Sequence, residues 1–439
     1  MMDEQKLRIT IYGLGYVGLP TAIEFHKSGY SVVGVDVSEK IVKGLKRGES
    51  HLSDSTAELE IPLNSKSWEV TNLVNENTSE VIIITVPTPV NDDRSPNLSF
   101  VESAMRSAIT SIDSKIIPII VLESTVFPGA TRSIAKKICE ESGFEIGVDF
   151  ELAYSPERVS PGELGRTAGE VPRIVGCDNK ETGELLVDLY SKITNGGCTY
   201  VGSIEVAEAA KLIENTQRDI DIAFVNELAN VLPLVGVDAM DALRAASTKW
   251  NFHFHSPGIG VGGHCIPVDP YYYIQMSIEN RWPSIISPAA REINSNMPHF
   301  SAERVLSLLE KNSTSALILG YSYKPEVGDI RETPVRGFSR RLSSEIRNLY
   351  VWDPLVDSEE VYPPWITPVG DPYDSAKQVD IVILATGHKD CIDLDWRKLL
   401  GKCKSNILYD GPRLLKRAKL EEIGWKYFGT GSVHEEENG

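Results

Sequence analysis

A cysteine in a glycine-dense segment offers the most distinctive chemistry in this sequence. Cys265 ends the run Gly262–Cys265, and Asp269 lies four residues further along the chain. Glycine lets a backbone approach a ligand closely and turn where other residues cannot. A cysteine thiolate is a strong nucleophile, so this segment is suited to capturing an aldehyde carbon as a covalent intermediate. Because a thiol of ordinary pKa is mostly protonated at neutral pH, we expect a cation or a helix N-terminus near Cys265.

Cysteines can also bind metals or form disulfides, and both interpretations are less well supported here. His253, His255 and His264 lie near Cys265 in the sequence and raise the possibility of a zinc site. Their spacing matches no common zinc signature, so we predict no bound metal. The chain has six cysteines and none forms a CxxC pair. We therefore expect reduced, mostly buried thiols, and a buried structural thiol is the alternative to a nucleophile at Cys265.

A dinucleotide-binding signature opens the chain. An apolar stretch, Arg8–Tyr12, precedes the run Gly13–Gly18, and a helical pattern follows over Leu19–Ser28. A second apolar stretch, Ser31–Val35, then ends at Asp36. The GxGxxG pattern in a strand–helix–strand unit with an acid at its end predicts a site for a pyrophosphate at the helix N-terminus. Asp36 would accept hydrogen bonds from a ribose diol and repel a 2′-phosphate, which favours NAD over NADP.

Three further strands are expected in the first half of the chain, each followed by a polar loop. Parallel strands end at a common edge of a sheet, where ligands of open α/β sheets bind. The loops that contain Thr88, Thr125 and Glu157 should therefore line the cofactor crevice, although their prolines could equally be simple strand terminators. The strands are Val81–Val86, Ile116–Leu122 and Glu151–Tyr154.

A long helix is predicted over Ile204–Val231, where apolar residues recur at helical spacing. Such a length is unusual inside one dinucleotide-binding domain, so we interpret it as a connector between domains and an oligomer interface. Lys211 and Asn215 are four residues apart and share one face of this helix. A lysine on a largely apolar helix usually extends to solvent, which is the alternative to a role in chemistry.

The C-terminal third repeats the α/β pattern without a GxGxxG run, and a second nucleotide could bind there. We therefore predict an α/β fold with two Rossmann-like doubly wound domains joined by a long central helix. The expected domains are 1–200 for NAD, 201–300 for the helical connector with the Cys265 loop, and 301–434 for a nucleotide. The polar stretch after Gly429 is expected to be disordered. The four C-terminal strands are Ala316–Leu319, Leu349–Trp352, Ile381–Leu384 and Ile407–Tyr409.

Composition limits the classes of function. The 439 residues carry a net charge of −18 without an evident basic patch, which argues against a nucleic-acid partner. No apolar run is long enough to span a membrane, and the N-terminal residues lack the apolar core of a signal peptide, so we expect a cytoplasmic protein without a membrane partner. Any phosphate must then be held by local cations and main-chain amides.

Taken together, these motifs resemble the UDP-glucose/GDP-mannose dehydrogenase family over most of the chain. Members oxidise the C6 alcohol of a nucleotide sugar to a carboxylate with two NAD, and the resemblance implies this activity, a UDP-sugar substrate and a homodimer. The motifs that carry it are Gly13–Gly18, Val86–Pro89, Ser124–Gly129, Ser155–Arg158, Lys211–Asn215, Gly262–Cys265, Lys324 and Asp329–Pro334.

Within the family, the chain looks most like the UDP-N-acetylhexosamine branch. The run Glu157–Gly162 and the run Glu214–Asp219 are similar to that branch, and His264 stands where UDP-glucose enzymes usually have serine. The substrate implied is UDP-N-acetyl-mannosamine, -glucosamine or -galactosamine. The alternatives are a UDP-glucose 6-dehydrogenase, a non-catalytic nucleotide-sugar-binding protein, and a two-electron hydroxyacid dehydrogenase.

The resemblance also implies roles for individual residues. Cys265 would carry a thiohemiacetal and then a thioester, Lys211 and Asn215 would stabilise the oxyanion, and a partner subunit would contribute Lys249 or Arg244. The catalytic set is Cys265, Lys211, Asn215, Asp269, Glu157 and Thr125. The cofactor set is Gly13, Gly15, Tyr16, Val17, Gly18, Asp36, Thr88, Thr125 and Arg331. The substrate set is Glu157, Arg158, Lys211, Asn215, Lys249, Gly262 and Lys324.

Overall fold

The computed structural model describes residues 7–52, 59–63, 65–159, 166–310, 312–356 and 362–433, with the side chain of Gln378 excepted. The chain divides into two compact units, each built on its own sheet. Unit 1 is Met1–Asn215 with Tyr271–Trp282, and unit 2 is Thr216–Pro270 with Pro283–Gly439. The division into three domains at residues 200 and 300 stays a prediction.

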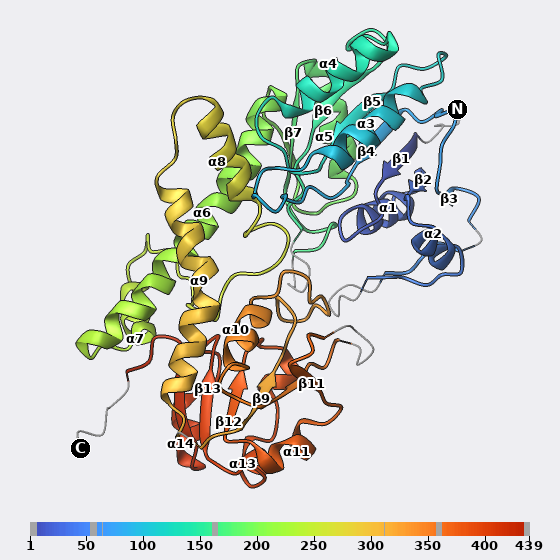
Figure 1. Ribbon diagram of the computed structural model, residues 1–439. Coiled ribbons are helices and arrows are strands. Elements are labelled where there is room, and N and C mark those ends of the chain that lie inside the picture. Colours follow the sequence, from blue (N-terminus) through green and yellow to red (C-terminus); the bar gives the residue numbers. More distant parts are fainter. Residues whose placement is uncertain are drawn as a thin grey trace. The chain divides into compact units, whose positions relative to one another are not determined.

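Unit 1 contains an eight-stranded sheet in the order β3-β2-β1-β4-β5-β6-β7-β8 (Figure 1). All neighbouring strands are parallel except β6 and β7. The order reverses between β1 and β4, which is the ligand-binding switch point of a doubly wound sheet. The strands are β1 (Arg8–Tyr12), β2 (Ser31–Val35), β3 (Trp68–Thr71), β4 (Val81–Ile84), β5 (Ile119–Leu122), β6 (Glu151–Tyr154), β7 (Arg173–Cys177) and β8 (Cys198–Tyr200).

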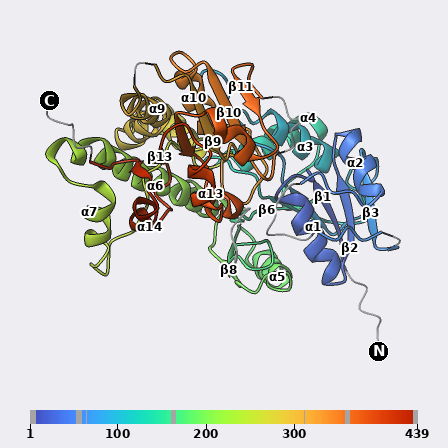
Figure 2. The ribbon, with the colours of Figure 1, turned by 90° about the horizontal axis from the view of Figure 1, so that it is seen from below.

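Helices cover both faces of this sheet because its central strands are apolar on both sides. Ile82 and Ile84 of β4 pack with residues of α3 and α4, whereas Val81 and Ile83 pack with residues of α1 and α5. Figure 2 shows α3 and α4 on one side of the strands and α5 on the other. The helices are α1 (Gly18–Lys27), α2 (Glu39–Lys46), α3 (Ser99–Thr110), α4 (Ala130–Ser142), α5 (Lys180–Ser191) and α8 (Asp269–Glu279).

Unit 2 contains a six-stranded, wholly parallel sheet in the order β11-β10-β9-β12-β13-β14. Its switch point lies between β9 and β12, which confirms the second doubly wound sheet. The strands are β9 (Ser315–Leu319), β10 (Asn348–Trp352), β11 (Ile366–Pro368), β12 (Ile381–Leu384), β13 (Ile407–Asp410) and β14 (Lys426–Gly429). The smaller helices are η1 (Leu232–Val235), α7 (Ala239–Ala246), α10 (Pro334–Leu342), α11 (Pro372–Ser375), η2 (Ala376–Gln378), α12 (Lys389–Ile392), α13 (Trp396–Leu400) and α14 (Arg417–Glu422).

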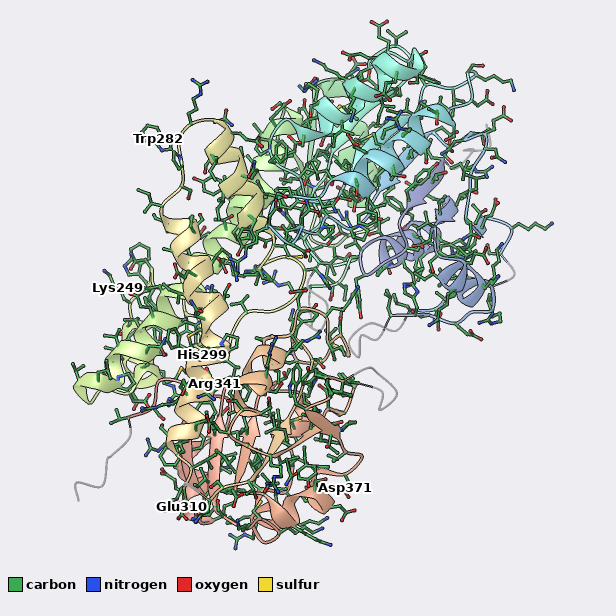
Figure 3. All side chains as sticks on the ribbon, viewed as in Figure 1. Lys249, Trp282, His299, Glu310, Arg341 and Asp371 are labelled. Atoms are coloured by element: carbon green, nitrogen blue, oxygen red, sulfur yellow. The ribbon has the colours of Figure 1, made fainter. Side chains whose placement is uncertain are left out.

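Two long helices organise the centre of the chain. Helix α6 (Ile204–Val231) has the bounds that the sequence predicts and runs through the boundary of the two units. Helix α9 (Ile286–Ser307) belongs to unit 2 and packs on α10. An ion pair joins the two helices, because the Glu303 carboxylate of α9 lies 2.5 Å from Arg341 of α10. Figure 3 labels Arg341 and also His299, which lies one turn before Glu303 on α9.

Some sequence expectations need correction. The strand predicted from Ile116 begins at Ile119, because Ile116 closes a turn with Asp113. The stretch after Gly429 is not disordered throughout, since Thr430 and Ser432 are buried; residues 434–439 lie outside the described part of the chain. Among the described helices, no single one is long and apolar enough to cross a membrane, although one bent pair within Ile204–Ala246 meets the criteria of length and composition.

Candidate active site

The glycine-rich turn of unit 1 connects β1 to α1 at the switch point, and its three glycines have different surroundings. Gly13 has a φ of +92°, and a Cβ there would lie 2.9 Å from the carbonyl oxygen of Thr85. A Cβ on Gly18 would lie 1.9 Å from the Gly13 carbonyl oxygen. Only glycine therefore allows α1 to begin this close to the turn. At Gly15 nothing lies within 4 Å of the same test atom. The middle glycine thus leaves open space where a pyrophosphate needs to approach the backbone.

Asp36 directly follows β2 and lies beside this turn. Its carboxylate accepts hydrogen bonds from the main-chain amides of Leu14 and Ser38, both at 2.9 Å. These bonds hold an acid at the position where a dinucleotide-binding fold places its ribose acceptor. Tyr16 and Val17, the other turn residues predicted to meet the cofactor, are half-buried.

Two loops after β4 and β5 lie next to this turn. Thr85 donates a hydrogen bond to the Gly13 carbonyl oxygen at 2.7 Å, and Ser124 donates one to the Val86 carbonyl oxygen at 2.7 Å. Thr88 is held through its carbonyl oxygen, which accepts from Tyr272 of α8 at 3.1 Å. Thr125 is buried directly after Ser124. These loops therefore meet at the carboxyl edge of the sheet, as the sequence predicts.

Glu157 and Lys211, two of the predicted catalytic residues, are in direct contact. The Lys211 ammonium donates a hydrogen bond to the main-chain carbonyl oxygen of Glu157. The Glu157 carboxylate accepts from the Val159 amide, and Arg158 pairs with Glu214 of α6. Lys211 is buried, so it does not extend to solvent. The part of the branch motif at Ser160–Gly162 lies outside the described residues.

A buried ionic network lies beside the loop that carries Glu157. Arg173 donates to Glu123 at 3.1 Å and to Thr21 at 3.3 Å, and one of its nitrogens lies 3.7 Å from the Glu157 carboxylate. Tyr190 also donates to Glu123, at 2.6 Å. Burial raises the pKa of Glu123, although Arg173 opposes the shift. Sequence reasoning did not identify this network, because Arg173, Tyr190 and Thr21 lie far from Glu123 in the sequence and belong to none of the motifs.

Cys265 belongs to a turn directly before α8. Its side chain is exposed, and its carbonyl oxygen accepts from the amides of Val268 and Asp269 at 3.0 and 2.8 Å. The main chain of Cys265 thus lies one turn before the N-terminus of α8, where a nearby thiolate would be favoured by the helix dipole. Asp269 is the first residue of α8 and is buried.

The glycines beside Cys265 pack against another part of unit 2. A Cβ on Gly262 would lie 2.7 Å from Pro334, and one on Gly263, which has a φ of +91°, would lie 2.7 Å from the Tyr323 ring. These glycines therefore allow the cysteine turn to lie against the loop that carries Lys324. The sequence predicted close approach to a ligand; the structure shows close approach to protein.

His264 is not the cation that Cys265 requires. Burial lowers its pKa, and the neighbouring Arg331 lowers it further, while Asp329 and Glu332 act in the opposite direction. Arg331 itself forms a hydrogen-bonded ion pair with Asp329, its shortest contact being 2.6 Å. Its predicted contact with the cofactor stays a prediction.

The predicted contribution from a partner subunit is not resolved between two residues. Lys249 is exposed just after α7 (Figure 3), and Arg244 on α7 lies 3.4 Å from Asp241. Either side chain is accessible from outside this chain. No group of three or more histidine, cysteine or acidic side chains in the described residues could hold a metal ion.

Three family models match this chain, and they match it in the same order as the sites described above. Models of the UDP-glucose/GDP-mannose dehydrogenase family match the chain in three parts: the NAD binding domain at residues 7–194, the central domain at 205–296 and the UDP binding domain at 317–417. The chain belongs to this family. It is an NAD-dependent UDP-sugar dehydrogenase, with its NAD-binding and UDP-binding domains linked by a central helical region.

Relatives cover nearly the whole enzyme. A UDP-N-acetyl-D-glucosamine 6-dehydrogenase of Pseudomonas aeruginosa is 35% identical over 95% of this chain and 99% of its own. A UDP-N-acetyl-D-mannosamine dehydrogenase of Pyrococcus horikoshii is 32% identical over 97% of this chain and 100% of its own. A solved UDP-D-ManNAc dehydrogenase structure from Pyrococcus horikoshii matches with a TM-score of 0.83 at 30% identity, covering 97% of this chain and 99% of its own. A UDP-glucose dehydrogenase structure from Pyrobaculum islandicum matches with a TM-score of 0.85 at 26% identity, covering 99% of both chains.

Proposed function

We propose that the enzyme oxidises the C6 hydroxyl of a UDP-N-acetylhexosamine to the uronate in two NAD-dependent steps. The observation that carries the proposal is an exposed cysteine at the N-terminus of α8, in a chain whose relatives include enzymes named for UDP-N-acetylglucosamine and UDP-N-acetylmannosamine. UDP-glucose is the second candidate, because the match to a UDP-glucose dehydrogenase structure is equally extensive.

Cys265 is the proposed nucleophile of the second oxidation. Its thiolate attacks the C6 aldehyde, and the resulting thiohemiacetal holds the carbon that loses the next hydride. Bound NAD supplies the hydride acceptor for both oxidations. Loss of hydride and a proton leaves a thioester, which water cleaves to the carboxylate and the free thiol. The hydrolysis is strongly favourable, so the overall reaction runs in one direction.

The remaining residues act on protons and charge around C6. Lys211 and Asn215, one helical turn apart on α6, are proposed to stabilise the oxygen that becomes negative in each step. Asp269 orients the hydrolytic water, and Glu157 with Thr125 positions that water near the thioester carbon. The Lys211–Glu157 contact supports this grouping, because it holds the Lys211 ammonium against the main chain of the residue whose carboxylate is proposed to act on water.

Substrate and cofactor contacts follow from the two sheets. Lys324 lies in the loop after β9 of the UDP-binding domain and is proposed to meet the diphosphate, with Gly262 beside that loop. Arg158 and Lys249 are proposed to complete the substrate contacts, and Arg331 to reach the cofactor. The NAD site is proposed at the Gly13–Gly18 turn, together with Asp36, Thr88 and Thr125.

We also propose a homodimer. Large apolar side chains are exposed on the central helices of unit 2, where they would be covered by a second copy. Leu234 is 81% exposed and Ile285 is 84% exposed. The others are Phe224, Val231, Val235, Ile286 and Phe300.

A substrate panel tests the proposal. The purified enzyme is incubated with NAD and, separately, UDP-N-acetylglucosamine, UDP-N-acetylmannosamine, UDP-N-acetylgalactosamine and UDP-glucose, and both NADH and uronate are measured. We expect an N-acetylhexosamine to give two NADH for each uronate. Turnover of UDP-glucose alone would refute the substrate assignment, and one NADH for each sugar would refute the double oxidation. Binding without turnover of any of the four would favour a non-catalytic nucleotide-sugar-binding protein.

A further inference from the structure

The buried face of α6 is polar over several turns. Its members are spaced by three, four or seven residues and therefore lie on one side of the helix. The first of them, Glu208, accepts hydrogen bonds from the amides of Gly129 and Thr131 at the start of α4. The set is Glu208, Lys211, Asn215, Asp219 and Asn226. Two of these residues are proposed catalytic groups and Glu208 binds the start of α4, which leaves Asp219 and Asn226 without an assigned task.

Asp219 and Asn226 belong to a buried hydrogen-bonded cluster between α6 and α9 in unit 2. Arg291 donates to the Asp219 carboxylate at 2.6 Å, and Asn294 donates to the same oxygen at 2.7 Å. Asn226 then donates to the side-chain oxygen of Asn294 at 2.9 Å. We call these four residues, Asp219, Asn226, Arg291 and Asn294, the polar clamp; none is more than 4% exposed.

The polar clamp reaches both ends of the segment that carries the nucleophile. The amide of Gly258 donates to the Asn226 side chain at 3.1 Å. At the other end, Arg291 donates to the carbonyl oxygen of Ile266 at 3.4 Å. We call residues 258–266 the nucleophile loop. One end of the loop is bound by Asn226 of α6 and the other by Arg291 of α9. Cys265 directly precedes Ile266, the residue that Arg291 binds.

Between these anchors the nucleophile loop has firm support. Ile259 is buried in the apolar core that α9, α10 and the second sheet share. A Cβ on Gly260 would lie 2.8 Å from Pro334 and 3.0 Å from Pro298. The loop therefore has little room to shift sideways, and the polar clamp defines where it starts and ends.

Stability alone does not account for the polar clamp. Burial raises the pKa of Asp219, although Arg291 and Asn294 act in the opposite direction, so the surroundings on balance disfavour the ionised carboxylate. Replacing a buried ion pair by apolar residues of similar volume is often neutral or stabilising. A buried polar cluster does give directional bonds, and these fix a loop more closely than apolar packing does.

We propose that the polar clamp consists of positioning residues: it holds one end of the nucleophile loop on α6, the helix that also carries Lys211 and Asn215, and the other end on α9, and so sets the position of the Cys265 sulfur during catalysis. The inference rests on the proposed role of Cys265. It adds four residues that touch neither substrate nor cofactor but act through the loop.

Two asparagine variants of α6 test the anchor at Gly258, the second being a control at an exposed position. Asn226→Leu removes the acceptor of the Gly258 amide. Asn230→Leu changes another asparagine of α6, which bonds Met297 of α9 at 3.4 Å but not the loop. We expect Asn226→Leu to lower kcat about 100-fold, the loss typical of a misplaced reacting group, with KM for both substrates within about threefold of wild type. Asn230→Leu should keep wild-type kcat.

The second anchor is tested without leaving a buried charge. The double variant Asp219→Leu/Arg291→Met replaces the ion pair by apolar side chains, so the fold should persist. We expect its melting temperature to stay near wild type and its kcat to fall at least about tenfold. We also expect a changed rate of Cys265 alkylation when the folded enzyme is treated with iodoacetamide and the peptide that carries Cys265 is then analysed. This variant also decides the matter if Asn226→Leu does not fold.

Wild-type kcat and wild-type Cys265 alkylation in the folded double variant would overturn the proposal, as would equal losses in Asn226→Leu and Asn230→Leu. Failure of the proposed function itself would be seen separately, as an active Cys265→Ser enzyme.

Discussion

The ammonium group of Lys211 donates a hydrogen bond to the main-chain carbonyl oxygen of Glu157. The lysine comes from α6 and the carbonyl from the loop after β6, and both residues are buried. A lysine ammonium has three donors, so this bond fixes the direction of the group and leaves donors for a developing oxyanion. The contact also means that a change at one residue should be felt at the other.

Lys211→Met is expected to lower kcat by about 100- to 1,000-fold, because it removes a charged donor aimed at the reacting oxygen. Initial rates of NADH formation at saturating sugar and NAD measure the effect. Lys43→Met is the control, since Lys43 is an exposed lysine that pairs with Glu39 on α2. Turnover of Lys211→Met within a few-fold of wild type would contradict the role.

The six thiols should differ sharply in reactivity. Burial raises the pKa of the other five, to about 11 for Cys177 and Cys198 and about 12 for Cys403, whereas Cys265 is exposed before a helix N-terminus. Since only the thiolate reacts, iodoacetamide at pH 7.5 should label Cys265 first. Peptide mass spectrometry measures each site, and unfolding in guanidinium should make all six react. Equal labelling of Cys177 in the native enzyme would contradict this expectation.

Much of the fold could be predicted because it depends on local patterns. Runs of β-branched residues predicted β1 and β4 to within two residues, and helical periodicity gave the bounds of α6. The turn that Ile116 closes with Asp113 makes β5 shorter than predicted, which shows that an apolar run marks a strand but not its ends. The burial of Thr430 could not be predicted, because its partners are distant in sequence: its main chain accepts from Arg413, and its hydroxyl contacts Tyr409.

The residues of the candidate site also differ in whether the sequence could reveal them. Cys265, Asp36 and the glycines stand in contiguous motifs, so their residue types and spacing reveal them. Arg291 and Arg173 act through side chains buried far from their partners in sequence, and neither belongs to a motif. One signal was available: Asp219 and Asn226 continue the helical face of Lys211, and a polar residue at a buried helical position needs a partner.

Asp36→Asn should weaken NAD binding and narrow the preference for NAD over NADP. An asparagine can still accept from one of the Leu14 and Ser38 amides, but it lacks the charge that repels a 2′-phosphate. The ratio of kcat/KM for the two cofactors measures the change, which we expect to be about tenfold or more, since one lost charge contact is worth roughly 1–2 kcal/mol. Unchanged cofactor kinetics would refute the ribose contact.

Leu234→Glu is expected to shift a dimer towards monomer. Leu234 is exposed on η1 among the apolar side chains of the central helices, and a buried unpaired carboxylate at an interface costs several kcal/mol. Size-exclusion chromatography with light scattering at several concentrations measures the mass. Leu73→Glu, at an exposed leucine of unit 1, is the matched control and should not change it. A monomeric wild-type enzyme, or no effect of Leu234→Glu, would reject this interface.

Cys265→Ser should lower overall turnover at least about 1,000-fold while the fold is retained, because the side chain is exposed and a serine is a weaker nucleophile and leaving group than a thiolate. Cys139→Ser, in α4, is the matched control and should keep its activity, since burial raises the pKa of that thiol.

The covalent step can also be observed directly. Glu157→Gln should slow thioester hydrolysis, so that quenched reactions contain the sugar nucleotide bound to the peptide that carries Cys265. Full uronate production by Cys265→Ser would reject covalent catalysis at this sulfur, whatever the substrate is.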